Sequence, residues 1–211
     1  MIVGGTGLFI DSLVDNIKFT EAETDFELRN ELMQKSADEL YDTLLKIDNE
    51  AALKIHKNNK SRVARAIEIY YTAGKTKTMQ NEDSRKEESP YETLYLVLVY
   101  KNREILYDRI NRRVDMMIKS GLIPEAERVL ADSGSKTSAQ AIGHKELKPY
   151  LDGEITLDTA VDNLKKETRH YAKRQITWFK RRENAEMIYM DSDENPVSSA
   201  VNKCREFIYG K

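Results

Sequence analysis

Cysteine is almost absent from the 211-residue chain, since Cys204 is the single one. One cysteine cannot form an internal disulfide, and no combination of cysteines and histidines has the spacing of zinc ligands. Neither disulfides nor structural zinc therefore support the fold. We interpret His56, His144 and His170 as polar or core side chains and predict no metal site from them.

Long hydrophobic runs are absent too. The longest, residues 94–100, is far shorter than the roughly 20 residues that cross a bilayer as a helix. The glycine-rich start has neither a basic leader nor a small-residue cleavage site. These absences favour a soluble, cytoplasmic protein with no membrane partner, and a hydrophobic content of 40% is enough for a core.

Charge is nearly balanced, at a net charge of −2, but it is unevenly distributed along the chain. Acidic residues outnumber basic ones 12 to 7 in residues 1–60, whereas residues 165–182 hold eight basic residues and one acid, Glu167. Such a concentration of positive charge is typical of a segment that binds a polyanion. The eight basic residues are Lys165, Lys166, Arg169, Lys173, Arg174, Lys180, Arg181 and Arg182.

Continuous apolar runs predict strands that are covered on both faces. Residues 1–3 precede a glycine turn and a helix, residues 94–99 form the clearest run, and residues 185–190 are a third candidate. Runs without polar alternation are typical of parallel sheets. Because three strands make too small a parallel sheet, we expect an α/β core whose first strands would precede Met1.

Between the first two strands, the chain has the features of an all-helical domain. Residues 20–89 carry helix caps and periodic apolar residues but no β-branched alternation. The predicted division is therefore an α/β core with C-terminal helices, residues 1–19 and 90–211, interrupted by a helical insertion domain, residues 20–89.

Helix boundaries are predicted from capping residues. Residues 24–27 and 36–39 match capping boxes, and Asp48 and Ser61 can cap two further helices, the last ending at Gly74. After the second strand, periodicity predicts helices at residues 103–119, 124–132, 138–151, 157–182 and 196–209.

Two glycine-containing motifs bear on phosphate binding. In residues 4–7, N–H groups at a helix N-terminus and the Thr6 hydroxyl could hold a phosphate or polar group, but an ordinary tight turn explains the same sequence. Residues 74–76, Gly-Lys-Thr, are not a phosphate loop, because Ile69 stands where the pattern requires glycine and a helix precedes them.

Three arginines, Arg109, Arg112 and Arg113, follow the second strand on the next helix. Open α/β sheets bind ligands at the carboxyl ends of their strands, and arginine forks match phosphate oxygens. Pairing with Asp108 and Asp115 on a solvated face is equally compatible with the spacing.

Residues 169–182 combine cations with aromatic side chains at helical spacing. Arg174, Trp178 and Arg181 share one stripe, which suits contact with RNA phosphates and stacking on an unpaired base. A solvated charged face is the alternative, but the shortage of acidic partners favours RNA or phosphate binding. A smaller basic cluster, residues 56–65, begins the last long helix of the insertion and also suits phosphate.

Taken together and in order, five segments resemble the tRNA dimethylallyltransferases, also called tRNA isopentenyltransferases. They are residues 2–8, 61–66, 74–76, 140–146 and 173–179. The resemblance implies a P-loop NTPase-like core with a helical insertion. It also implies transfer of a dimethylallyl group from dimethylallyl diphosphate, with Mg²⁺, to the exocyclic amine of the adenine 3′ of the anticodon. The expected partners are a tRNA anticodon stem-loop, with that adenine flipped out, and dimethylallyl diphosphate, and a monomer is expected.

The resemblance also implies site residues. Thr6 would lie at the reacting adenine, and Arg113 would contact the diphosphate. His144 stands where the family commonly has a tyrosine. The tRNA would be held by Arg29, Ser61, Arg62, Val63, Ala64, Arg65, Gln140, Ala141, Ile142, Gly143, His144, Lys145, Lys173, Arg174, Gln175, Ile176, Thr177, Trp178, Phe179 and Lys180.

Two parts of the family's site are expected before Met1: the phosphate loop, which holds diphosphate although it resembles an ATP site, and an aspartate that acts as general base. We therefore expect a truncated enzyme that binds tRNA and is inactive alone. A natural, non-catalytic tRNA-binding form is the alternative. An ATP-using small-molecule kinase is disfavoured by the basic helix around Trp178 and by the large insertion.

Overall fold

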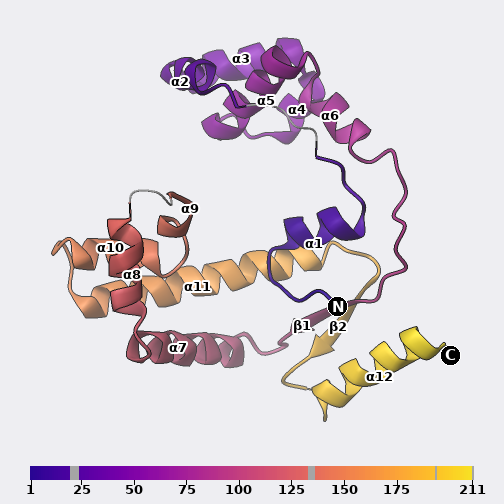
Figure 1. Cartoon of the computed structure of the whole chain (residues 1–211), viewed down its shortest axis with the longest axis vertical. Coiled ribbons are helices and arrows are strands. Elements are labelled where there is room, and N and C mark those ends of the chain that lie inside the picture. Colours follow the sequence, from indigo (N-terminus) through magenta and orange to yellow (C-terminus); the bar gives the residue numbers. More distant parts are fainter. Residues whose placement is uncertain (20–23, 133–135, 193, 211) are drawn as a thin grey trace. The chain divides into compact units, whose positions relative to one another are not determined.

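The computed structural model describes residues 1–19, 24–132, 136–192 and 194–210 (Figure 1). Contacts within the chain group these residues into two compact units, Met1–Thr93 and Leu94–Lys211. Every described element of the first unit is a helix, whereas the second unit contains both described strands. None of the described helices is long and apolar enough to span a bilayer.

Local capping signals set most helix boundaries in the first unit. Ser36 and Glu39 form the predicted capping box, and Asp48 accepts a hydrogen bond from the Ala51 N–H at 3.0 Å. Two predicted caps are wrong by one or two residues, because Asp25 and Asn59 cap α2 and α5 in place of Thr24 and Ser61. The helices are α1 (Gly7–Val14), α2 (Phe26–Gln34), α3 (Ala37–Ile47), α4 (Asn49–Lys54), α5 (Lys60–Ala73) and α6 (Lys77–Asp83).

Helices α2 to α5 share one hydrophobic core. Leu40 and Leu44 of α3 and Val63 and Ile67 of α5 are all 0% exposed, and Ala52 of α4 packs with them. Burying an aliphatic side chain of this size contributes about 1.5–3 kcal/mol, so this core is the main stabilising feature of the insertion.

The chain enters and leaves this helical group at one place. The Lys18 N–H donates to the Ser84 carbonyl at 3.0 Å, and the Ser89 hydroxyl donates to the Val14 carbonyl at 2.6 Å. Adjacent entry and exit segments are expected of an inserted domain. The assignment of residues 1–19 and 90–211 to one core stays a prediction.

The second unit contains a parallel pair of strands, β1 (Tyr95–Val99) and β2 (Ala185–Tyr189), with Val97 opposite Met187. Both were predicted as strands. The predicted strand at residues 1–3 is wrong for the described structure, because these residues pair with no strand and Val3 is 82% exposed. Extended chain becomes sheet only where a neighbour supplies the hydrogen bonds.

The helices of the second unit follow the predicted periodicity with one interruption. The predicted helix at 138–151 is divided, because Gly143 adopts a left-handed φ of +111° between α9 and α10. The other boundaries agree with prediction to within three residues. The helices are α7 (Arg103–Lys119), α8 (Leu122–Ala131), α9 (Lys136–Ala139), α10 (His144–Leu151), α11 (Leu157–Phe179) and α12 (Pro196–Tyr209).

The core of the second unit lies where α7, α8, α10 and α11 meet (Figure 1). Val114, Leu147 and Leu164, from α7, α10 and α11, are at most 1% exposed. The far end of α11 is held separately, since the Phe179 ring centre lies 6.0 Å from that of Tyr95 on β1. Helix α11 is thereby anchored at both ends along one face.

Candidate nucleic-acid interface

Helix α11 and the residues just after it divide their basic side chains between two faces. Three cations turn inward. Lys165 pairs with Asp115 of α7 at 2.7 Å, and Arg169 donates to a side-chain amide oxygen of α7 at 2.7 Å. The Arg182 guanidinium lies 4.8 Å from the ring centre of Tyr95. These three residues hold the helix in place, and their donors are directed into the unit.

The other five cations lie on the outer face of the same segment. All five are exposed, and no salt bridge within the described part of the chain engages any of them. Within the described residues, carboxylates therefore do not neutralise this face by ion pairing, and its positive charge stays exposed to solvent. The five are Lys166, Lys173, Arg174, Lys180 and Arg181.

An aromatic side chain lies among these outward cations. Trp178 is 40% exposed, one helical turn beyond Arg174, and the Arg174 guanidinium lies 5.8 Å from the ring centre of Tyr171. An exposed indole beside guanidinium groups suits stacking on a base together with contact to its phosphate. Phe179, by contrast, is buried and serves the fold.

The arginines of α7 have separate environments. Arg112 pairs with Asp108 at 2.7 Å, and the Arg109 guanidinium lies 5.8 Å from the ring centre of Tyr100. Arg113 is exposed and makes no ion pair with a described residue. Because it is exposed and has no described ion-pair partner, Arg113 is the arginine of this group that is most open to a ligand. At a rise of 1.5 Å per residue, Arg113 lies about 15 Å along the axis from the first residue of α7.

A side chain of the unit itself occupies the carboxyl end of β1, where parallel sheets commonly bind ligands. The Asp191 carboxylate accepts hydrogen bonds from the N–H groups of Asn102, at 2.7 Å, and Lys101, at 2.9 Å. These hydrogen bonds hold the pKa of Asp191 below its ordinary value, and the one from the Asn102 N–H has the largest effect. The N–H groups just before α7 are thus already satisfied.

The predicted tRNA-holding segment 140–145 forms the turn between α9 and α10. The Gly143 N–H donates to Glu146 Oε2 at 2.8 Å, which fixes the turn, and Gly143 is buried. A Cβ at this position would lie 3.6 Å from Leu122 Cδ1. The residues that the turn exposes are Gln140, Ala141, Ile142 and Lys145.

His144 faces α8, and its side chain is only 12% exposed. Nδ1 donates to the Ser138 carbonyl at 2.9 Å, and Nε2 lies 3.1 Å from Glu125 Oε1. Because a carbonyl and a carboxylate both accept, the ring makes both bonds when both nitrogens carry hydrogen. The ring that was expected to contact tRNA is therefore engaged within the unit.

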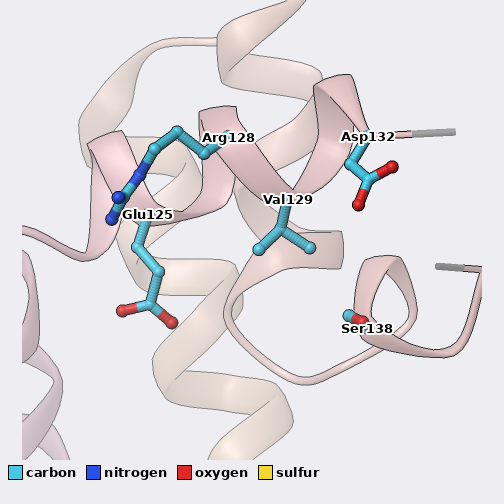
Figure 2. A pocket seen from close by; sticks show the side chains of 5 residues that line it. All are labelled: Glu125, Arg128, Val129, Asp132 and Ser138. Carbon is cyan, nitrogen blue, oxygen red and sulfur yellow. The ribbon is translucent and has the colours of Figure 1, made fainter. Parts of the chain in front are cut away.

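Glu125 and Ser138 also line a pocket of about 270 Å³ beside α8 (Figure 2). In Figure 2 the side chains of Glu125 and Arg128 lie at one end and Asp132 at the other, with Val129 between them. The described lining thus combines two carboxylates with one guanidinium.

In the first unit, two of the arginines expected to hold tRNA share one buried carboxylate. Glu68 is 0% exposed and accepts hydrogen bonds from Arg29 and from Arg65, each at a shortest distance of 2.7 Å. The two arginine side chains remain 35% and 34% exposed. One buried carboxylate thus holds two partly exposed guanidinium groups at this surface.

The other residues of the predicted segment 61–65 are partly exposed and partly buried in the core. Ser61 and Arg62 are exposed, whereas Val63 and Ala64 are core residues at 0% and 1% exposure. Thr6 is also exposed; it caps α1 through its carbonyl, and its hydroxyl makes no capping hydrogen bond. Within the described residues, no three His, Cys, Asp or Glu side chains come together as a metal site would require.

Residues 1–182 match a family model described as IPP transferase. The chain belongs to the IPP transferase family. Among relatives in this family, the tRNA dimethylallyltransferase of Acetivibrio thermocellus is 43% identical over 208 residues, which cover 94% of this chain and 66% of that protein. The chain thus spans about two thirds of the length of the curated relatives it matches.

Solved structures of IPP transferases are similar as well. The full-length tRNA isopentenylpyrophosphate transferase of Bacillus halodurans matches with a TM-score of 0.61 at 39% identity, covering 99% of this chain and 65% of that one. A eukaryotic dimethylallyltransferase acting on tRNA matches with a TM-score of 0.77 at 27% identity, covering 99% and 56%. The family resemblance and the α/β, P-loop NTPase-like fold class predicted from sequence are confirmed.

Sequence reasoning missed Glu68 as the partner of two site arginines. Its three-residue spacing from Arg65 is a usable signal for one ion pair. The second pair, with Arg29, joins residues 39 positions apart, so that only the packing of α2 on α5 reveals it.

Proposed function

We propose that this chain is part of a tRNA dimethylallyltransferase and supplies the surfaces that hold the RNA substrate. The observation that carries the proposal is the outer face of α11 and of the residues just after it, which exposes five cations and, one turn beyond Arg174, a tryptophan that is 40% exposed. Its relatives are named for the same activity, which supports the assignment. The substrate would be a tRNA anticodon stem-loop, and the protein would act in the cytoplasm as a monomer.

The proposed reaction is a displacement at carbon. The exocyclic nitrogen of the adenine 3′ of the anticodon attacks C1 of dimethylallyl diphosphate, and a C–N bond forms as the C–O bond to diphosphate breaks. The nitrogen loses a proton to a base, and diphosphate leaves with the electron pair of the broken bond. The protein must therefore position the amine in line and stabilise negative charge on the leaving group.

The residues of this chain have proposed roles in that reaction. The exposed hydroxyl of Thr6 would contact the adenine, and the Arg113 guanidinium would contact the leaving diphosphate. Arg29 and Arg65, the turn at residues 140–145 and the outer face of α11 would hold the stem-loop. The adenine would be unstacked into the site, because an amine within the stack is out of reach.

Mg²⁺ is proposed as the cofactor, since it would neutralise charge on a diphosphate. Within the described residues, no three His, Cys, Asp or Glu side chains come together as a ligand set. These side chains therefore do not by themselves fit the ion.

The decisive experiment separates binding from transfer. We expect the 211-residue chain to bind an anticodon stem-loop with strong salt dependence and to form no isopentenyladenosine when dimethylallyl diphosphate and Mg²⁺ are added. Salt-insensitive binding would contradict the role of α11. Formation of the product would refute the expected inactivity, whereas binding without transfer also fits the alternative, a non-catalytic tRNA-binding form.

A further inference from the structure

A basic pocket lies within the first unit, where α4, α5 and α6 meet. Its volume is about 330 Å³, which is within the range of small-molecule sites. Aliphatic side chains such as Ile55 and Ile69 form the rest of the described wall, and no carboxylate is among the described lining residues. The polar lining consists of Lys54, Arg62, Arg65, Lys77, Thr78 and Asn81.

The cations of this pocket differ in whether a described carboxylate pairs with them. Lys54 pairs with a surface carboxylate, Glu50. Arg65 pairs with Glu68, which also pairs with Arg29. Arg62 is exposed and pairs with no carboxylate in the described part of the chain. The described lining therefore holds four cations and no carboxylate, and a bound anion would offset the charge of Arg62.

Lys77 is a half-buried cation of this pocket that no described carboxylate neutralises. It is half-buried, and its ammonium donates to the neutral side-chain oxygen of Gln80 at 3.1 Å. Burial first, and then the positive charge of Arg65, lower the pKa of Lys77. No described carboxylate pairs with it, so a bound anion would relieve both effects.

We propose that this pocket binds one backbone phosphate of the RNA substrate, with Lys77 and Arg62 as its principal ligands. The inference rests on the proposed function and extends it to Lys77, which lies outside every segment that sequence reasoning assigned to tRNA. A phosphodiester fits better than a free inorganic anion, because aliphatic walls beside the cations match a sugar next to its phosphate. Charged donors bind phosphate oxygens more strongly than neutral ones.

The test compares two lysines two residues apart in the 211-residue chain. Lys77→Met should weaken binding of an anticodon stem-loop about tenfold and reduce the magnitude of the salt slope by roughly 0.7–0.9, as expected for one lost phosphate contact. Lys75→Met is the control, because Lys75 is exposed, pairs with Asp83 at 2.6 Å and does not line the pocket. Lys77→Arg, which keeps the charge, should retain the salt slope.

The possible outcomes distinguish a failure of the pocket proposal from a failure of the proposed function. If Lys77→Met leaves affinity and slope unchanged while Arg174→Ala weakens binding, the pocket proposal is overturned and the function of α11 stands. If the unaltered chain binds no stem-loop, both fail. An NMR signal of the Lys77 ammonium that shifts with inorganic phosphate but not with the stem-loop would overturn the assignment to RNA. Unfolding curves of each variant verify that the fold is retained.

Discussion

Arg29 and Glu68 form a two-pronged contact in which Nε and Nη2 of the arginine donate to one carboxylate oxygen, Oε2, at 2.9 and 2.7 Å. The contact joins α2 to α5 across 39 residues of sequence. The other oxygen of Glu68 accepts from Arg65 and from the Asp25 N–H, so that one buried carboxylate organises four donor groups. Two partly exposed arginines of the insertion are thus held by a negative charge buried beneath them.

Removing that charge should destabilise the first unit. We expect Glu68→Ala to lower the free energy of unfolding by about 2–3 kcal/mol, less than for a fully buried pair because both arginines reach solvent. Glu50→Ala is the control, since the Glu50–Lys54 pair is exposed and should contribute under about 0.5 kcal/mol. Urea unfolding followed by circular dichroism measures both, and equal losses would contradict the prediction.

Asp48 should make the stability of the same unit depend on pH. Burial alone would raise the pKa of Asp48, but hydrogen bonds from the Ala51 N–H and from the N–H and hydroxyl of Thr78 outweigh it, so that the pKa lies below the ordinary 3.8. A lowered folded-state pKa contributes stability that is present above 3.8 and is lost as the pH falls through the folded value.

We therefore expect Asp48→Ala to lower the free energy of unfolding by about 2 kcal/mol near neutral pH, because it removes the N-cap of α4 and the hydrogen bonds from Thr78 of α6. The difference from the unaltered chain should shrink on acidification below pH 3.8. Asp42→Ala, at an exposed position on α3, serves as the control and should stay within about 0.5 kcal/mol. A pH-independent difference would show that the ionised carboxylate is not what matters.

Two substitutions on α11 should weaken RNA binding in different ways. Trp178→Ala removes a stacking surface and should cost about 1–3 kcal/mol of affinity for the anticodon stem-loop with little change in salt slope. Arg174→Ala should lower the magnitude of the slope by roughly 0.7–0.9. Lys148→Ala, at an exposed lysine paired with Asp152 on α10, is the control. Fluorescence anisotropy over a salt series measures all three, and unchanged affinity in both α11 variants would refute the interface.

The turn before α10 should be sensitive to a single methyl group. Gly143 has φ +111° and ψ −57°, a conformation that residues with a Cβ avoid, so Gly143→Ala should destabilise the second unit by about 2 kcal/mol. Gly121→Ala, at φ +101° and ψ 23°, tests a milder left-handed position and should cost about 1 kcal/mol. Thermal unfolding compares them, and a reversed order would contradict the argument from backbone strain.

Local signals predicted much of the secondary structure because their causes are local. The helices at 103–119 and 196–209 have the predicted bounds, and the Ser36–Glu39 capping box is present. The errors also have local causes: Asp25 competes with Thr24 as a cap, and Gly143 interrupts a periodic pattern that otherwise continues. The pairing of β1 with β2, 90 residues apart in register, needed the tertiary structure to be seen.

In the candidate site, too, some features follow from local sequence and others only from tertiary contacts. The sequence by itself determined the family, the run of eight basic residues and the helix that carries most of them. Only the tertiary structure decided that Lys165, Arg169 and Arg182 turn inward while five others face solvent. Their partners, Asp115, Asn111 and Tyr95 respectively, come from α7 and β1. Helical spacing defines the stripes of a helix, but neighbours distant in sequence decide which stripe is buried.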